Sequence, residues 1–185
     1  MSMIKIYPNH ANDNILHKAK KIKLIISDVD GVMTDGSIYL DKEGNDVLMK
    51  FNALDGMGIN MALQCGLQFA IISGRKSHQV EIRGKNLNIQ HIYLGITNKV
   101  EIVNLLIKKL NINYDEIAYI GDDVNDLGVL NLVGLKVAPP NANDEVLNRV
   151  ELITKKSGGC GALRELIDYI LNAQNLLSEY LAVFI

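Results

Sequence analysis

Short apolar runs alternate with longer segments of helical periodicity along most of the chain. The runs with the length and apolar character of buried strands cover residues 24–27, 68–72, 91–94, 117–120 and 135–138. The segments with helical spacing lie between and after these runs, at residues 57–65, 77–87, 99–110, 124–132, 144–150 and 162–172. Short apolar strands that alternate with helices are typical of a parallel sheet covered on both faces. The pattern therefore predicts an α/β fold, a three-layer sandwich with a mostly parallel central sheet.

One segment, residues 36–52, departs from this alternation. It contains two strand-like pieces, 37–40 and 47–51, on either side of the polar stretch Asp-Lys-Glu-Gly-Asn-Asp. A short polar turn with a glycine between two strands predicts a β-hairpin. An isolated hairpin is marginally stable in water, so we expect hairpins of several subunits to pack together. That packing would bury the apolar residues Ile38, Leu40, Val47 and Leu48.

The C-terminal segment, about residues 173–185, is unusually apolar for a chain end. It finishes with Leu-Leu-Ser-Glu-Tyr-Leu-Ala-Val-Phe-Ile. Apolar side chains of this kind are not left in water as a solvated tail. We therefore expect the tail to dock on its own subunit or on a neighbouring one.

Composition restricts the classes of protein that fit the chain. Its 185 residues are 48% hydrophobic and 22% charged, which predicts a single domain over residues 1–185. The formal net charge of −2 provides no basic surface for nucleic acid. The apolar runs fall far short of the ~20 residues of a membrane span, and we expect no signal peptide. We expect Cys65 and Cys160 to be free thiols, and we place the protein in the cytoplasm, without nucleic acid or membrane partners.

Polar clusters follow four of the predicted strands, at the point where each strand ends. Ligands of an open parallel sheet bind at the carboxyl ends of the strands, so one rule of topology brings these clusters together. The clusters are Asp28-Val29-Asp30-Gly31, Ser73-Gly74-Arg75, Lys99, and Gly121-Asp122-Asp123-Val124-Asn125-Asp126.

The first cluster places two carboxylates, Asp28 and Asp30, in the same small space. Such charges repel each other and are costly to desolvate unless a positive partner lies nearby. A carboxylate can attack phosphorus and form an aspartyl-phosphate, and a second carboxylate can protonate the leaving alcohol and later activate water. The positive partners would be a divalent ion such as Mg²⁺ and the compact charge of Lys99. The clusters therefore favour metal-dependent phosphoryl transfer.

The same residues resemble a known family. Asp28-x-Asp30-Gly31, Ser73-Gly74, Lys99 and Gly121-Asp122-Asp123-x-x-Asp126, in this order, are similar to the four motifs of the haloacid dehalogenase superfamily of phosphatases. The segments DVDGVMTDGSIYLD, FNALDGMGI, ISGRKS and SGGCGALRE further resemble the subfamily of 3-deoxy-D-manno-octulosonate 8-phosphate phosphatases. The resemblance covers about residues 20–170. It implies a capless, Rossmann-like fold, a sugar-acid phosphate substrate, Mg²⁺ as cofactor, a role in lipopolysaccharide biosynthesis, and a homotetramer.

The resemblance also implies roles for the catalytic residues. Asp28 would be the nucleophile and Asp30 the general acid and base. Ser73 and Lys99 would complete the catalytic set and, with Asp30, bind the substrate phosphate. Arg75 would contact the substrate.

The metal site follows from the same resemblance. Mg²⁺ would be held by the side chain of Asp28, the backbone carbonyl of Asp30 and Asp122. Asp123 and Asp126 would lie at its edge or just outside it, although both also suit the first turn of a helix as acidic residues. The sequence leaves open which of Asp122, Asp123 and Asp126 touches the ion.

Other readings of the chain remain at this point. The substrate could be the 9-phosphate of a nine-carbon keto-sugar acid, or the protein could bind a phosphosugar without catalysis. A receiver domain also uses aspartates and a lysine on a parallel sheet, but its phospho-accepting aspartate follows the third strand, where this chain has Leu94-Gly95. Gly158, Gly159 and Gly161 fit either a flexible turn or a close approach to substrate or to a neighbouring chain.

Overall fold

The computed structural model describes residues 13–44 and 46–184. A six-stranded sheet in the order β5-β4-β1-β6-β7-β8 forms its centre, and every neighbouring pair of strands is parallel. The strands are β1 Leu24–Ser27, β4 Gln68–Ser73, β5 His91–Leu94, β6 Ile117–Ile120, β7 Leu135–Ala138 and β8 Leu152–Ile153. The predicted parallel sheet is confirmed, with β8 as an additional edge strand.

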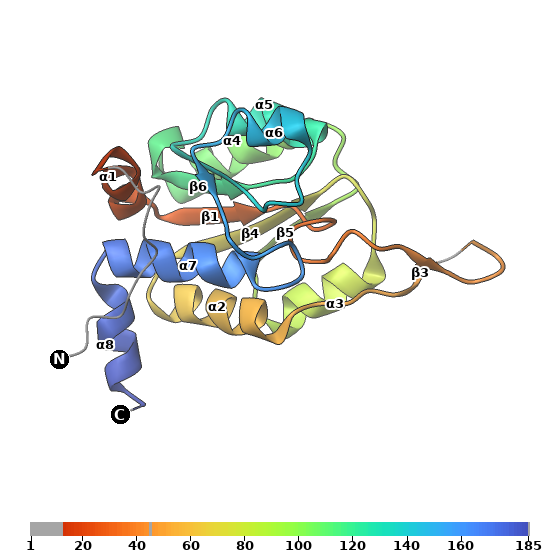
Figure 1. Ribbon diagram of the computed structural model, residues 1–185, viewed down its shortest axis with the longest axis horizontal. Coiled ribbons are helices and arrows are strands. Elements are labelled where there is room, and N and C mark those ends of the chain that lie inside the picture. The colour runs from red at the N-terminus through yellow and green to blue at the C-terminus, as the bar shows by residue number, and fades with distance from the viewer. Residues whose placement is uncertain (1–12, 45, 185) are drawn as a thin grey trace.

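Helices cover both faces of this sheet (Figure 1). One face carries α1 Asp13–Lys21, α2 Ala53–Gln64, α3 His78–Asn86, α7 Ala162–Ala173 and α8 Leu176–Ala182. The other carries α4 Lys99–Leu110, α5 Leu127–Leu130 and α6 Asp144–Leu147. In β1, Ile25 packs into the first layer, and Leu24 and Ile26 pack into the second. The chain is therefore the three-layer α/β sandwich that its pattern predicts.

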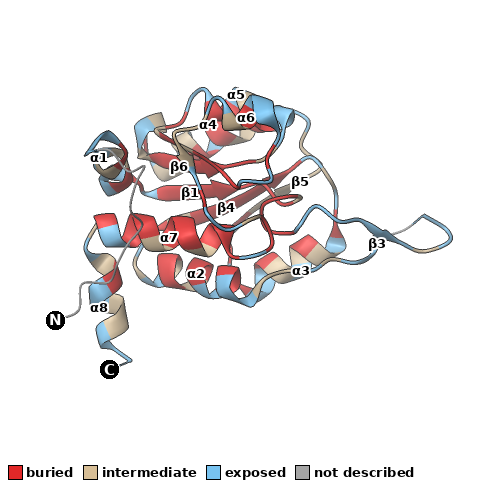
Figure 2. Cartoon of the chain, viewed as in Figure 1, coloured by how far each residue is buried: buried red, intermediate tan, exposed pale blue. Residues whose placement is uncertain are grey.

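The centre of the sheet is buried on both faces (Figure 2). All residues of β1 and β6 are buried, because each of these strands has a neighbour on either side and a helical layer above and below. This burial explains why both strands read as continuous apolar runs rather than as alternating patterns. It also fixes the residues that directly follow these strands at one edge of the sheet.

The predicted hairpin forms a separate two-stranded sheet. Strands β2 Tyr39–Leu40 and β3 Asp46–Leu48 pair in antiparallel fashion and are shorter than the sequence pattern predicts. The hairpin projects away from the sandwich (Figure 1). Its apolar side chains are more than half exposed: Ile38, Leu40, Val47 and Leu48. The hairpin thus presents to solvent an apolar surface that its own chain does not cover.

Several helix boundaries differ from the prediction for local reasons. Helix α2 begins at Ala53 because the side chain of Asn52 accepts a hydrogen bond from the amide of Leu54 and caps the helix. The segment 124–132 is divided into a 3-10 turn, Val124–Asp126, and the short helix α5. Segment 144–150 ends as α6 at Leu147. Helix α1 was not predicted.

The C-terminal tail docks in part on its own chain. It forms α8, in which Leu177 is buried against the core, whereas Val183 and Phe184 at its end are exposed. Most of the N-terminal stretch in which we expect no signal peptide lies outside the described residues. Within residues 13–44 and 46–184, each helix is too short or too polar to cross a lipid bilayer. Cys65 and Cys160 are free thiols.

Candidate active site

The four polar clusters meet at the carboxyl edge of the sheet. Asp28 directly follows β1, Ser73 ends β4, Lys99 begins α4, and Asp122 lies two residues beyond β6. The segments that follow β1, β4 and β6 line a cavity of about 310 Å³. The cavity is lined by Asp28, Asp30, Gly31, Gly36, Ser73, Gly74, Arg75, Asp122, Asp123 and Asn125. The topology rule used on the sequence therefore assembles the expected residues in one place.

Lys99 is buried next to the cavity without lining it, and its ammonium group lies between two carboxylates. Its Nζ is 3.0 Å from Oδ1 of Asp28 and 2.7 Å from Oδ1 of Asp126, and all three side chains are buried. Burial alone would lower the pKa of Lys99, but the charges of Asp28 and Asp126 outweigh it and the pKa is raised. A cation at the first position of a helix is unfavourable for the helix dipole. The two carboxylates offset that cost and keep Lys99 charged beside Asp28.

Asp126 organises the floor of the site. Its Oδ1 accepts hydrogen bonds from Lys99 Nζ and, at 2.5 Å, from the hydroxyl of Tyr119. Its Oδ2 accepts from the backbone amides of Asp122 and Asp123, at 3.0 and 3.3 Å. Four donors therefore engage this one carboxylate, which holds the turn after β6 against Lys99 and Tyr119.

Tyr119 is a residue of the site that the sequence analysis missed. It is fully buried in β6, and its hydroxyl lies 3.4 Å from Lys99 Nζ as well as against Asp126. Burial, followed by the charge of Asp126, raises the pKa of Tyr119 well above its usual value, so the phenol stays protonated and donates. The available signal was a tyrosine in an otherwise aliphatic strand, since a buried phenol needs a polar partner.

Asp122 packs against the loop that carries the first two aspartates. A Cβ on Gly31, which has φ +77°, would overlap Oδ2 of Asp122, so only glycine allows this approach. One carboxylate oxygen from each of Asp28, Asp122 and Asp126 lies within 4.8 Å of the others. Three carboxylates thus share a space in which Lys99 is the neighbouring cation.

The electrostatics of this cluster fit a divalent cation. Burial, and then the charge of Asp126, raises the pKa of Asp28 to about 6 despite the lowering effect of Lys99. Burial, and then the charges of Asp28 and Asp126, raises the pKa of Asp122 to about 7. Lys99 alone therefore does not balance the carboxylates. Hard oxygen ligands with excess negative charge are what Mg²⁺ requires.

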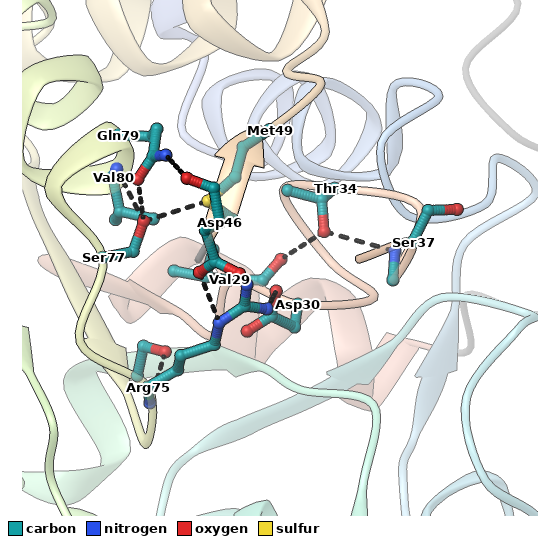
Figure 3. A network of polar contacts seen from close by, with 12 residues as sticks. Val29, Asp30, Thr34, Ser37, Asp46, Met49, Arg75, Ser77, Gln79 and Val80 are labelled. Atoms are coloured by element: carbon teal, nitrogen blue, oxygen red, sulfur yellow. Dashed lines mark hydrogen bonds and ion pairs between the residues drawn. The ribbon is translucent and has the colours of Figure 1, made fainter. Parts of the chain in front are cut away.

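Asp30 also lines the cavity, and its side chain faces Arg75 (Figure 3). Nη1 of Arg75 is 3.3 Å from Oδ1 of Asp30, and Nε of Arg75 donates to Oδ2 of Asp46 at 3.1 Å. Burial raises the pKa of Asp30, and the charge of Arg75 lowers it in part. Asp46 belongs to β3, so the hairpin reaches this part of the site. The sequence analysis assigned no role to Asp46.

Ser73 and Asp123 occupy the remaining expected positions. Ser73 is buried, lines the cavity, and accepts a hydrogen bond from the amide of Arg75 at 3.2 Å. Asp123 is exposed and its side chain accepts from the amide of Val124 at 2.8 Å. Asp123 therefore caps the following turn and also lines the cavity.

The glycine-rich loop after β8 supports the aspartate loop. A Cβ on Gly158 would overlap the carbonyl oxygen of Gly31, and the amide of Gly159 donates to the carbonyl of Val32 at 2.9 Å. Asn141 joins both loops, since its Nδ2 donates to Gly31 O at 2.9 Å and its Oδ1 accepts from Gly158 N at 2.7 Å. The close approach seen at Gly158 and Gly159 is made to the aspartate loop of the same chain, whereas the sequence analysis considered substrate or a neighbouring chain.

The raised pKa values lead to a prediction about stability. In the metal-free protein Asp28 and Asp122 titrate near 6 and 7, above their ordinary value of 3.8. The stability they contribute is full below about pH 4 and is lost as the pH rises through these values. A divalent cation offsets the loss at high pH, whereas protons compete with it at low pH. We expect Mg²⁺ to raise the melting temperature at pH 8 by at least about 3 °C more than at pH 5.

Thermal unfolding with and without Mg²⁺ at both pH values measures this difference. In the variant Asp122→Asn the difference between the two pH values should become smaller, because only Asp28 of the two still titrates in this range. An equal Mg²⁺ effect at pH 5 and pH 8 in the unmodified chain would contradict the assignment of these carboxyls.

Comparison with known proteins gives results that agree with this geometry. Residues 68–166 match the family model of the haloacid dehalogenase-like hydrolases. The 3-deoxy-D-manno-octulosonate 8-phosphate phosphatase of Escherichia coli (strain K12) is 43% identical over 166 residues, which cover 90% of this chain and 88% of that protein.

Solved structures agree as well. A hydrolase of Legionella pneumophila, described as a putative member of the haloacid dehalogenase superfamily, is 44% identical with a TM-score of 0.89 and covers 93% of this chain and 94% of its own. The 3-deoxy-D-manno-octulosonate 8-phosphate phosphatase of Moraxella catarrhalis, solved in complex with a magnesium ion, a phosphate ion and a KDO molecule, is 40% identical with a TM-score of 0.90. That match covers 94% of this chain and 99% of the other.

Proposed function

We propose that this chain, which belongs to the haloacid dehalogenase-like hydrolases and is a phosphatase, hydrolyses 3-deoxy-D-manno-octulosonate 8-phosphate. The products are 3-deoxy-D-manno-octulosonate and phosphate, and the reaction is a step of lipopolysaccharide biosynthesis in the cytoplasm. The observation that carries the proposal is the buried Asp28 carboxylate, held by Lys99 beside Asp122 at the edge of the sheet. The choice of sugar acid rests on the relatives that bear this activity in their names.

The proposed reaction proceeds in two steps. An oxygen of Asp28 forms a bond to phosphorus as the bond to the sugar oxygen breaks, and Asp30 gives its proton to that leaving oxygen. A water molecule then attacks the aspartyl-phosphate while Asp30 takes a proton from it, which releases phosphate and restores Asp28. Ser73 and Lys99 bind the transferred phosphoryl group through its equatorial oxygens. Arg75, at the rim of the cavity, contacts the substrate.

Mg²⁺ in this site would offset the repulsion between the nucleophile and the anionic substrate. We assign its protein ligands as the Asp28 side chain, the Asp30 backbone carbonyl and Asp122. Asp123 and Asp126 stay outside the coordination sphere. This choice is supported by the four donors that already engage Asp126 and by the capping hydrogen bond of Asp123.

A panel of sugar phosphates tests the substrate. With phosphate release as the readout, octulosonate 8-phosphate should give the highest kcat/KM. The runner-up is the 9-phosphate of a nine-carbon keto-sugar acid, and a higher kcat/KM for that compound would replace the proposed substrate. Absence of turnover on every phosphate in the presence of Mg²⁺ would instead favour a protein that only binds phosphosugars.

We further propose that residues 1–185 form one capless domain that assembles as a homotetramer with active sites at subunit interfaces. The segment between Asp35 and Ser73 holds only the hairpin, α2 and β4 among its described residues, which leaves no separate cap to close the cavity. Phosphoryl transfer benefits from a site that limits water. Packing of hairpins from neighbouring subunits would both cover their exposed apolar side chains and supply the lid.

The predicted assembly can be checked by its mass in solution, which light scattering measures. We expect a mass of four times the 20.5 kDa chain. The variant Leu48→Lys, which places a charge on the exposed apolar face of the hairpin, should lower that mass and reduce activity on the sugar phosphate. Leu105→Lys is the matched control, because Leu105 is similarly exposed but lies on α4. A monomeric mass with full activity would refute the shared site.

A further inference from the structure

We propose that Asp46, on strand β3 of the hairpin, is a positioning residue that keeps the guanidinium of Arg75 from closing onto Asp30. The inference rests on the proposed function in so far as Asp30 is the group that protonates the leaving oxygen. It adds to that function a residue from outside the cavity lining, which acts on Asp30 through Arg75.

The geometry places one cation between two carboxylates from different elements (Figure 3). The Nε and Nη2 atoms of Arg75 both contact Oδ2 of Asp46, whereas only Nη1 reaches Asp30, at 3.3 Å. Charge-assisted hydrogen bonds are usually about 2.7–2.9 Å long. The Asp46 side of the guanidinium is therefore the engaged side, and its contact with Asp30 is long and made by a single nitrogen.

Contacts between the base of the hairpin and the start of α3 hold Asp46 beside Arg75. The side-chain amide of Gln79, at the start of α3, donates to the backbone carbonyl of Asp46 at 2.9 Å. Ser77 Oγ also lies 3.1 Å from the sulfur of Met49, just beyond β3 (Figure 3). The base of the hairpin is thus fastened to the segment that follows Arg75, and the side chains of Asp46 and Arg75 are both partly buried.

Loss of the Asp46 carboxylate would change the pairing partner of the Arg75 guanidinium. An arginine fork pairs best with a carboxylate when two parallel N–H groups meet its two oxygens. With Asp46 neutralised, the nearest carboxylate able to accept such a pair is Asp30. Both oxygens of Asp30 would then face Arg75, and neither would be free to face the leaving oxygen of the substrate. Asp46 thereby preserves the freedom of Asp30 to act.

The test uses two aryl phosphates whose leaving groups differ in their need for a proton. Nitrophenolate leaves readily without protonation, whereas the leaving oxygen of phenyl phosphate depends strongly on a general acid. For Asp46→Asn with Mg²⁺ we expect kcat/KM to fall about tenfold on phenyl phosphate and less than about twofold on 4-nitrophenyl phosphate. A merely structural role for Asp46 would lower both values equally, and that result would overturn the proposal.

A double-mutant cycle tests whether Arg75 transmits the effect. In the background Arg75→Gln, the additional change Asp46→Asn should leave the ratio of the two kcat/KM values unchanged within about twofold. A further change of the ratio as large as in the unmodified background would overturn the proposal. Glu43→Gln is the matched control, since it removes one carboxylate from the same hairpin without touching Arg75, and it should leave the ratio as it is.

Two further measurements distinguish a failure of this inference from loss of the fold or assembly and from a failure of the proposed substrate. Melting curves and light scattering of each variant reveal any loss of fold or assembly, and variants that keep both carry the comparison. A protein that hydrolyses the aryl phosphates but not octulosonate 8-phosphate would contradict the proposed substrate, while the ratio of kcat/KM values would still decide the role of Asp46.

Discussion

Replacement of Asp28 by asparagine is expected to lower turnover by about 10³-fold or more while the fold stays intact. The amide keeps the size and shape of the carboxylate but cannot attack phosphorus, so no aspartyl-phosphate forms. Stability should change little, because Lys99 keeps its contact with Asp126 and one of the crowded negative charges is removed. Steady-state phosphate release and a thermal unfolding curve measure the two effects.

Asp115→Asn provides a control for this change. Asp115 undergoes the same chemical substitution, but it is exposed and lies near the opposite end of the sheet, before β6. Its variant should keep the activity of the unmodified chain. If Asp28→Asn retained more than about a tenth of the original rate, the assignment of Asp28 as nucleophile would be wrong.

Removal of Mg²⁺ is expected to abolish activity, and its return to restore it. Without the ion, Asp28 and Asp122 share their space with Asp126 beside one lysine, and burial raises their pKa values to about 6 and 7. A nucleophile in that state is in part protonated near neutral pH, and it is repelled by the substrate when it is not. Phosphate release in excess chelator, followed by titration with Mg²⁺, measures the loss and the recovery.

Ca²⁺ should inhibit rather than replace Mg²⁺. It accepts more ligands at longer distances, which would displace the Asp28 oxygen from its line of attack. Asp122→Asn should raise the Mg²⁺ concentration needed for half-maximal activity, because one anionic ligand is lost. Full activity in excess chelator, together with a purified protein free of metal, would exclude this account.

The central part of the fold was accessible to sequence reasoning because its signals are local and strong. The runs that became β1 and β6 are apolar throughout, since both faces of each strand are buried. Strand β8 was missed because two residues, Leu152 and Ile153, carry no pattern, and their pairing with β7 is decided by tertiary contacts. The segment 124–132 has helical spacing, but it forms a 3-10 turn, begun by a capping box of Asp123 and Asp126, before the short helix α5.

The candidate site likewise contains residues that could be predicted from the sequence and residues that could not. The residues at strand ends could be predicted because one topology rule places them together. Tyr119, Asn141 and Asp46 could not, because each is a common residue type whose partner is made near only by folding. Asp46 reads in the sequence as part of a polar turn, and its contact with Arg75 depends on how the hairpin base lies against the start of α3.

The position of β1 between β4 and β6 has a consequence for how the native state fluctuates. Hydrogen exchange in a folded chain proceeds through partial openings, of which the least costly release exposed elements and the most costly release central strands. The exposed hairpin belongs to the first kind and β1 to the second. The nucleophile therefore sits in the unit that opens last. Asp46 sits in the hairpin, which would open earlier than β1 in an isolated subunit and which the proposed packing of hairpins would protect.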